Sequence, residues 1–368
     1  VWDFTNRLGT LANPVSGALK HALENLESGE SWALAPSYVD GNEYMLRPCI
    51  KWGVKEGSFC HMNELFGPVL SVMCAKDLKH AIEIVNATGY GLTSGIESLD
   101  EREVAYWRKH LKAGNLYINR GTTGAIVLRQ PFGGLGKSAV GTGRKAGIHN
   151  YITQFMDIVD VAEPSIKHSV QHSFIHLIHD WVDSCHKGAH SGFKADFGKL
   201  SLAVGSYLEN YAETFSQEKD FVNVRGEDNL FKYLPLSKIA LRITKDDGLF
   251  DVMSRVMAAR IAQTSLHVSI ELSAESNVIS FLYENQGVLL GKNDTIERED
   301  EAAFVKCFES VDKIFYADET RITPFVYEAA SKKAKCIVRS KPLMEGRVEL
   351  LHFFNEQCIS HSYHRYGN

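Results

Sequence analysis

Strand-like and helix-like segments alternate along this chain in two separate stretches, and this alternation limits its fold more than any other feature. In the first stretch, β-favouring runs at 69–73 and 115–118 flank an amphipathic helical pattern at 77–88. The second stretch repeats the alternation, with strand patterns at 239–243, 268–270, 313–316 and 336–338 and a helical pattern at 252–262. Because strands that alternate with helices build parallel sheets, we predict an α/β protein with two Rossmann-like layers, one after the other.

Composition excludes several classes of function. The chain has 368 residues, 44% of them hydrophobic and 23% charged, which is ordinary for a globular protein, and its length predicts two cores. A formal net charge of −5 without a long Lys/Arg run argues against a nucleic acid or an anionic membrane as partner. No apolar stretch approaches the ~18–20 residues that span a bilayer. The seven cysteines have no CxxC spacing, so we expect reduced thiols and a cytoplasmic protein.

Two segments border the first α/β stretch. Residues 16–29 carry leucines at helical spacing and end on Gly29, which predicts a short amphipathic helix. Residues 151–161 have an extended pattern and are followed by a Glu-Pro pair, which predicts a strand that leaves one domain. We therefore place a domain boundary near residue 163 and expect mostly helical structure at 165–224.

Four short motifs follow one another in the first stretch and carry a family resemblance. In order they are Asn63-Glu64-Leu65-Phe66-Gly67-Pro68-Val69, Tyr90-Gly91-Leu92, Gly114-Asn115-Leu116-Tyr117-Ile118-Asn119 and Pro131-Phe132-Gly133-Gly134. This order is similar to the C-terminal half of the aldehyde dehydrogenase superfamily. The resemblance implies that Glu64 hydrogen-bonds the nicotinamide ribose of NAD and that Phe66 packs near the nicotinamide ring. A carboxylate can accept two ribose hydroxyls, and an aromatic edge can fix the ring face. Taken alone, the same residues would be a strand-edge carboxylate and a simple turn.

The loop before the last motif narrows the resemblance. Its sequence, Arg-Gly-Thr-Thr-Gly-Ala-Ile-Val at 120–127, resembles the aldehyde-anchor loop of L-glutamate-γ-semialdehyde (1-pyrroline-5-carboxylate) dehydrogenases. The resemblance implies that Gly124 and Ala125 hold the α-carboxylate of the substrate with backbone amides, and that Phe132 packs on its aliphatic stem. Small residues let two N–H groups approach an anion closely. The alternative is an ordinary Gly-rich surface loop.

The C-terminal tail carries a second resemblance. Residues 356–368 are similar to the terminal motif of the longer forms of proline utilization A proteins, which join an FAD-dependent proline dehydrogenase to the semialdehyde dehydrogenase. By that resemblance, residues 1–163 belong to the catalytic domain and contain an oligomerisation-type strand. Residues 164–368 would be a non-catalytic domain of aldehyde dehydrogenase-like fold that covers a substrate-channelling cavity. That second stretch contains no G-x-G-x-x-G motif, so nothing in it supports a dinucleotide site.

The resemblance implies NAD-dependent oxidation of L-glutamate γ-semialdehyde to glutamate, with a Cys thiolate as nucleophile. In this family the nucleophile lies further upstream of the E-x-F-G-P motif than the chain extends, and Cys49 and Cys60 lie on the wrong side of that gap. We therefore name no catalytic residue. Because Val1 is not an initiator Met, we expect a piece of a longer enzyme that is inactive alone. The alternative function is a non-catalytic scaffold or self-association module, and a homo-oligomer stays open.

A histidine-rich run suggests a different class of function, namely metal binding. His168, His172, His176 and His179 fall on one face if residues 166–179 are helical, and a metal could use that spacing. No H-E-x-x-H arrangement accompanies them, and imidazoles on successive turns usually share a solvated face. We therefore expect no metal site.

Overall fold

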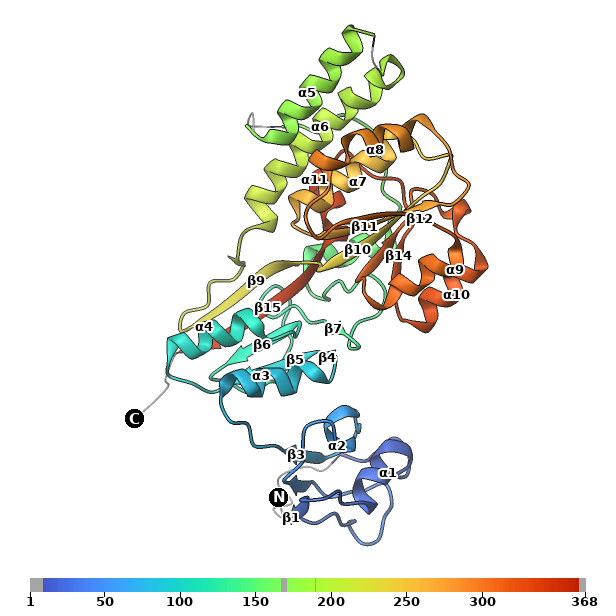
Figure 1. The fold of residues 1–368 in the computed structure, drawn as a ribbon. Coiled ribbons are helices and arrows are strands. Elements are labelled where there is room, and N and C mark those ends of the chain that lie inside the picture. Colours follow the sequence, from blue (N-terminus) through green and yellow to red (C-terminus); the bar gives the residue numbers. More distant parts are fainter. Residues whose placement is uncertain (1–8, 167–170, 189, 364–368) are drawn as a thin grey trace. The chain divides into compact units, whose positions relative to one another are not determined.

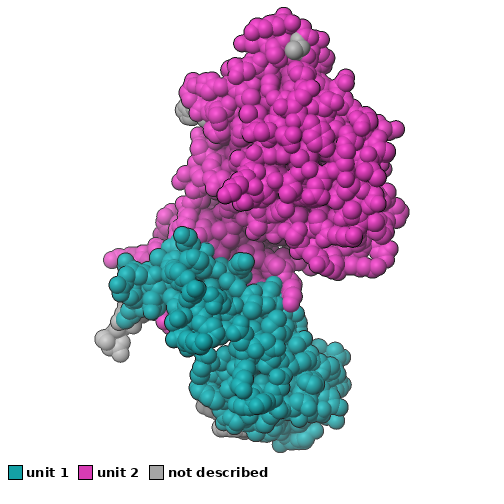
Figure 2. All heavy atoms as spheres, viewed as in Figure 1, with its two compact units in different colours: residues 1–90, 98–112 teal, residues 91–97, 113–368 magenta. Residues whose placement is uncertain are grey.

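The computed structural model describes residues 9–166, 171–188 and 190–363, and the chain divides into two compact units (Figures 1 and 2). The first unit comprises Val1–Tyr90 and Ser98–Lys112, and the second comprises Gly91–Glu97 and Ala113–Asn368. This division reflects packing, whereas the boundary near residue 163 rests on sequence pattern and resemblance. That boundary stays a prediction.

The first unit combines a small mixed sheet with short helices (Figure 1). Its elements are α1 (Gly17–Glu24), β1 (Ser31–Leu34), β2 (Cys49–Trp52), α2 (Phe59–Met62), β3 (Val69–Val72), α3 (Leu78–Ala87) and α4 (Glu101–His110). Strand β2 pairs antiparallel with β1 and parallel with β3. Ala22, Val54 and Cys60 form a small buried cluster beside this sheet.

Helix α1 is shorter than its sequence pattern predicts. Asn25 takes an extended conformation, and its N–H and its side-chain amide both donate to the carbonyl of His21. These bonds satisfy a terminal helix carbonyl, so the helix stops at Glu24 and the predicted end at Gly29 is wrong. Gly29 lies instead in the turn before β1, with a φ of +93°.

Helix α3 begins where the sequence predicts, but it buries a different face. Asp77 accepts a hydrogen bond from the His80 N–H at 2.8 Å and so caps the helix. The pattern at 77–88 predicts one apolar face with Leu78, Ala81, Ile82 and Val85, but Ile82 and Ile84 are the buried residues and Val85 is exposed. Helical periodicity locates an apolar stripe, but the packed neighbours decide which edge of the stripe is covered.

The second unit contains a five-stranded parallel sheet within its described residues (Figure 1). In spatial order the strands are β12 (Thr295–Glu299), β11 (Ser265–Glu271), β10 (Lys238–Ile243), β13 (Lys313–Phe315) and β14 (Cys336–Val338). The helices that connect them are α7 (Leu249–Ile261), α8 (Asn277–Leu289), α9 (Glu301–Phe304) and α10 (Pro324–Lys332). The strand order reverses direction at β10, which is the arrangement of a doubly wound sheet. The predicted second Rossmann-like layer is confirmed.

The sequence of β10 shows why both faces of this sheet are covered. Ile239, Leu241 and Ile243 alternate along the strand and belong to the core cluster that includes α7 and α8. Ala240 points to the opposite face and packs with Phe304. Figure 1 shows α7 and α8 on one side of the sheet and α9 and α10 on the other. Strands buried on both faces need near-continuous apolar runs, as this one has.

A second sheet in this unit joins segments that are far apart in the sequence. Its strands, in spatial order, are β5 (Thr93–Ile96), β6 (Asn115–Ile118), β15 (Phe354–Ser362), β9 (Glu227–Pro235) and β8 (Lys219–Asp220). Strand β15 runs antiparallel to β9 along its whole length, and its residues Cys358–His361 run parallel to β6. The other elements are β4 (Tyr90–Gly91), β7 (Leu135–Gly136), α5 (Ser173–His186), α6 (Lys194–Asn210) and α11 (Gly346–Glu349). Residues 354–362 are therefore a central strand next to β6.

The strand predicted at 151–161 is not present. A 3-10 helix spans His149–Phe155, and residues 156–161 have no regular structure. An extended segment forms a strand only when a neighbour completes its hydrogen bonds. Within the described residues these positions have no strand partner, and Val161 is 93% exposed.

The described histidines of the predicted face do not all lie on one helix. Helix α5 begins at Ser173, and His172 is its N-cap, accepting a hydrogen bond from the Phe174 N–H at 3.2 Å. His172 is thus outside the helix that carries His176 and His179, and His168 lies outside the described residues. In the described part of the chain, no group of three or more His, Cys, Asp or Glu side chains could hold a metal ion. None of the described helices is long and apolar enough to cross a membrane.

Candidate functional site

The turn that carries Glu64 and Phe66 connects α2 to β3 in the first unit. Phe66 has a φ of +48° and its side chain is 83% exposed. A left-handed conformation is uncommon for a bulky residue, and strain of this kind gathers at ligand sites. Glu64 is exposed as well, and its carboxylate makes no hydrogen bond or ion pair within the described residues. Both predicted side chains are therefore available to a ligand.

The base of this turn is held firmly. The Cys49 N–H donates to the carbonyl of Pro68 at 2.9 Å, which ties the turn to β2. A Cβ on Gly67 would lie 2.7 Å from both methyl carbons of Leu19, so only glycine fits there without displacing that side chain. A rigid base under exposed side chains is suited to preorganised binding.

The loop at 120–130 lies in the second unit and presents backbone donors. Gly124 has a φ of +104°, and its carbonyl accepts a hydrogen bond from the Tyr117 hydroxyl at 3.0 Å. Ile126 and Gln130 then exchange two backbone hydrogen bonds, of 3.3 and 2.7 Å. Among the described residues, no protein group accepts from the N–H of Gly124 or of Ala125, and both residues are exposed. Adjacent unpaired N–H groups form the kind of concavity that binds anions.

Phe132 lies at the base of this loop and is half-buried. It exchanges two backbone hydrogen bonds of 2.9 Å with Ala146. One residue earlier, the carbonyl of Pro131 accepts from the Asn115 side chain at 2.9 Å. The backbone around Phe132 is therefore fixed from two sides, while part of its ring stays accessible.

Lys145 holds the backbone directly after Phe132, and sequence reasoning did not single it out. The Lys145 Nζ donates to Asn115 Oδ1 at 2.9 Å and to the carbonyl of Gly133. Burial lowers the pKa of Lys145 to about 8, although Cys358 and Glu356 act in the other direction. Only the Gly114–Asn119 motif pointed to this region, since Asn115 belongs to it.

A second support reaches the loop from the C-terminal strand. The Arg120 guanidinium donates to Ser360 Oγ at 2.7 Å and lies 3.4 Å from Glu227 Oε2, and Arg129 pairs with the same carboxylate. In the amide orientation that satisfies both groups, Gln130 Oε1 accepts from Arg120 at 2.6 Å. Strands β9 and β15 thus hold both ends of the loop.

Glu356 is the buried centre of a third support. Its carboxylate is 0% exposed and accepts from the Lys145 N–H and from Asn150 Nδ2, both at 2.8 Å. The Arg144 guanidinium lies 3.6 Å away. Buried charges persist only when they are paired and hydrogen-bonded, and Glu356 meets both conditions. The sequence drew attention to Glu356 only as the first residue of the tail motif.

Four cysteines whose pKa is raised by burial are poor nucleophiles. Burial raises the pKa of Cys49 to about 11 and those of Cys307 and Cys358 to about 12. The pKa of Cys60 is also raised by burial, which outweighs the neighbouring Lys51 ammonium. Because the thiolate is the reactive form, these four thiols are protonated and unreactive near neutral pH. They add no candidate to the catalytic residues.

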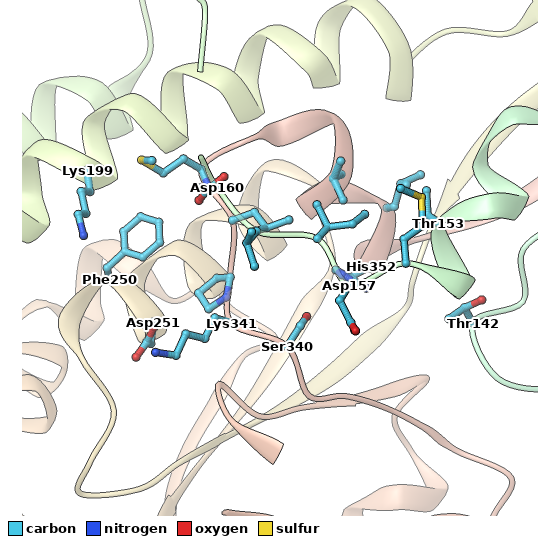
Figure 3. Close-up of a pocket in the computed structure, with 18 of the residues that line it drawn as sticks. Thr142, Thr153, Asp157, Asp160, Lys199, Phe250, Asp251, Ser340, Lys341 and His352 are labelled. Carbon is cyan, nitrogen blue, oxygen red and sulfur yellow. The ribbon is translucent and has the colours of Figure 1, made fainter. Parts of the chain in front are cut away.

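A cavity of about 690 Å³ opens at the carboxyl ends of β10 and β14 in the second unit (Figure 3). Figure 3 shows Phe250 and Asp251 at one end of it and Thr142 and Thr153 at the other. This edge of a doubly wound sheet is where such folds usually bind dinucleotides. Here Asp251 accepts from the Gly248 N–H at 3.1 Å and so occupies the N-terminus of α7. A pyrophosphate at that helix end would meet a carboxylate of the same sign.

Comparisons with known proteins find similarity to aldehyde dehydrogenases over part of the chain. Residues 11–161 match the family model described as the aldehyde dehydrogenase family. The chain is 36% identical over 159 residues to 1-pyrroline-5-carboxylate dehydrogenase of Geobacillus thermodenitrificans, covering 42% of this chain and 30% of that protein. It is 36% identical over 201 residues to the bifunctional protein PutA of Rhizobium meliloti, covering 53% of this chain and 15% of the relative. The solved structure of PutA from Corynebacterium freiburgense matches with a TM-score of 0.73 and 31% identity, over 97% of this chain and 32% of the other.

These matches confirm the resemblance and the fold class that the sequence predicted. The similarity to a PutA structure extends across both units, so it includes the second Rossmann-like layer. The chain spans about a third or less of the length of these relatives. The roles of Glu64, Phe66, Gly124, Ala125 and Phe132 stay predictions.

Proposed function

We propose, from the premise that residues 11–161 are part of an aldehyde dehydrogenase domain, that this chain contributes cofactor and substrate contacts to an NAD-dependent L-glutamate-γ-semialdehyde dehydrogenase. The substrate class follows from relatives named 1-pyrroline-5-carboxylate dehydrogenase. The observation that carries the proposal is the pair of unbonded, exposed N–H groups at Gly124 and Ala125, in the loop that leads to the half-buried Phe132. The two N–H groups offer an anion site, and Phe132 would supply an apolar wall, which suits an aldehyde with a distal carboxylate.

The first unit would supply the contacts to the cofactor. Glu64 would accept the ribose hydroxyls, and Phe66 would lie against the nicotinamide ring. Their exposure and lack of protein partners fit that use. NAD, when bound, would accept the hydride that the aldehyde carbon releases. The residues described here bind and orient the reactants, and we place the nucleophilic thiolate elsewhere in the protein that contains this chain.

Residues 164–368 would be a non-catalytic domain that completes the enzyme. The carboxylate at the N-terminus of α7 argues against a second dinucleotide site there. Strand β15 lies beside β6 and bonds the loop at 120–130 through Ser360, which favours a role in shaping the substrate path. In a bifunctional protein this domain would cover the cavity between the two active sites, and an FAD-dependent proline dehydrogenase would be the other activity. We also propose that the enzyme is cytoplasmic and that it can self-associate.

The proposal is tested by NAD reduction with L-glutamate γ-semialdehyde in the full-length protein that contains this chain. We expect turnover, and we expect Glu64→Ala to lower kcat/KM about 10–100-fold, because a charge-assisted contact of about 1.5–3 kcal/mol is lost. The loss should appear in NAD binding measured by fluorescence titration. Glu83→Ala, which removes an exposed carboxylate from α3, is the matched control. An inactive full-length protein, or equal effects of the two substitutions, would contradict the proposal.

Gly124→Ala tests the anchor loop separately. A Cβ at Gly124 meets only ordinary contacts, 3.5 Å from the side-chain amide of Gln130, but its φ of +104° strains any other residue by about 1–2 kcal/mol. We expect the loop to relax and the KM for the semialdehyde to rise about tenfold, with the KM for NAD unchanged. Gly121→Ala in the same loop is the control, because its φ lies outside the left-handed region and its Cβ would be 3.9 Å from Thr123 Oγ1. A parallel rise in both KM values would argue against a specific anchoring role.

A further inference from the structure

A small cavity in the second unit is lined by basic side chains, and we call it the basic cavity. Its volume is about 120 Å³, and it lies apart from the loop at 120–130 and from the larger cavity of Figure 3. Its lining residues are His149, Thr214, Gln217, Lys219, Phe221, Phe231, Tyr233 and Arg347. Three of them are basic and none is a carboxylate, so the walls offer hydrogen-bond donors without an acidic partner.

Most of the charged hydrogen-bond donors in the basic cavity have no acceptor among the described protein groups. Arg347 donates one side-chain hydrogen bond, to Asn150 Oδ1 at 2.6 Å, and forms no ion pair within the described residues. Within the same described ranges, the Lys219 ammonium has neither a hydrogen bond nor an ion pair. A guanidinium carries five N–H donors and an ammonium three, so most of this capacity is open.

Arg347 of the basic cavity also faces a second, buried guanidinium, that of Arg144. Glu356 is 3.6 Å from Arg144, and its carboxylate also acts on Lys145. Burial is the main cause of the lowered pKa of Arg144, and repulsion by Arg347 lowers that pKa further. Arg144 and Arg347 therefore both lie near one buried carboxylate, that of Glu356, to which Asn150 links Arg347. Unbalanced charge of this kind favours a counter-anion where solvent can reach it.

We propose that the basic cavity binds a small oxyanion, with Arg347 and Lys219 as its charged ligands and the Thr214 hydroxyl as a further donor. The volume of about 120 Å³ admits a phosphate or a small carboxylate and is too small for a nucleotide. Phe231 and Tyr233 form apolar walls that would exclude water from the bound ion and so strengthen its hydrogen bonds. This site is independent of the proposed dehydrogenase reaction and uses none of its residues.

The test is calorimetric titration of the full-length protein with inorganic phosphate and, separately, with acetate at constant ionic strength. We expect one site per chain for at least one of them, which also tells which oxyanion the cavity prefers. Lys219→Gln should weaken that binding about tenfold or more, because one charge-assisted bond is lost. Arg347→Gln should do the same, but it also removes the bond to Asn150 and could disturb folding. Lys219 makes no such bond, so its variant keeps the test decisive.

Lys292→Gln serves as the control, because it removes an exposed lysine outside the cavity. It should bind the anion like the unmodified protein. The proposal is overturned if neither anion binds with defined stoichiometry. It is also overturned if Lys219→Gln and Lys292→Gln bind equally, since that result would show only a general effect of salt on the protein surface.

Discussion

Glu356→Gln should raise the hydrogen-exchange rates of the β15 and β6 amides about a hundredfold, which corresponds to a loss of about 3 kcal/mol in the stability of the second unit. The substituted amide keeps the shape of the carboxylate but not its charge. Arg144 would then lose its ion-pair partner in a buried site, and Lys145 would lose the neighbouring negative charge. Exchange followed by mass spectrometry reports on each strand separately, so the result does not depend on two-state unfolding of a two-unit chain.

The control for this prediction is Glu328→Gln on helix α10. Glu328 pairs with Lys332 at 2.5 Å on the exposed surface, where ion pairs add little to stability. Its exchange rates should stay within about twofold of the original. Comparable protection in Glu356→Gln and the unmodified protein would show that the buried carboxylate does not hold the network together.

Lys313→Met should stabilise the protein at pH 7, and the gain should fade as the pH rises above 8. Lys313 is a buried residue of β13 that donates one long bond, 3.3 Å, to the carbonyl of His352. Burial, and to a smaller extent the nearby Arg144, lowers the pKa of Lys313 to about 8. At pH 7 the folded protein holds a charge that its surroundings disfavour. Methionine fills similar space without that charge, so we expect a gain of about 1–2 kcal/mol, or about 2–6 °C in Tm.

The sign of the pH dependence follows from proton binding. Between about pH 8 and the usual lysine pKa of about 10.4, the unfolded chain binds a proton that folded Lys313 has released. Raising the pH over this range therefore stabilises the unmodified protein relative to Lys313→Met. The difference in Tm should shrink from pH 7 to pH 10, whereas an exposed-lysine variant, Lys292→Met, should show no such trend. A difference that stays constant with pH would mean that folding does not lower the pKa of Lys313.

Local pattern predicted much of the regular structure. The strands at 69–72, 115–118 and 238–243 and the helix at 249–261 lie where hydrophobic periodicity indicated them, because each forms its apolar face from nearby residues. Pattern failed at 151–161, since a strand also needs a neighbour that the residues themselves do not specify. It also failed for the histidine run, where the extended N-cap at His172 starts the helix later than the spacing suggested.

The candidate site shows the same division. Motif order was enough to point to Glu64, Phe66, Gly124, Ala125 and Phe132, because these residues lie in compact motifs whose chemistry is local. The supports behind them were not visible in the sequence, since Glu356 meets the Lys145 N–H across 211 positions and Arg120 meets Ser360 across 240. No periodicity encodes contacts at such separations.

By itself, then, the sequence determined the α/β class and the placement of most strands and helices, and it pointed to the two short segments for which we predict ligand-binding roles. Only the tertiary structure decided that the C-terminal strand lies beside β6 and that Glu356 and Ser360 brace the loop. It also decided that several cations gather around one carboxylate beside the basic cavity. The physical reason is that backbone propensity and hydrophobic period act between near neighbours, whereas buried ion pairs and sheet order depend on which distant segments pack together.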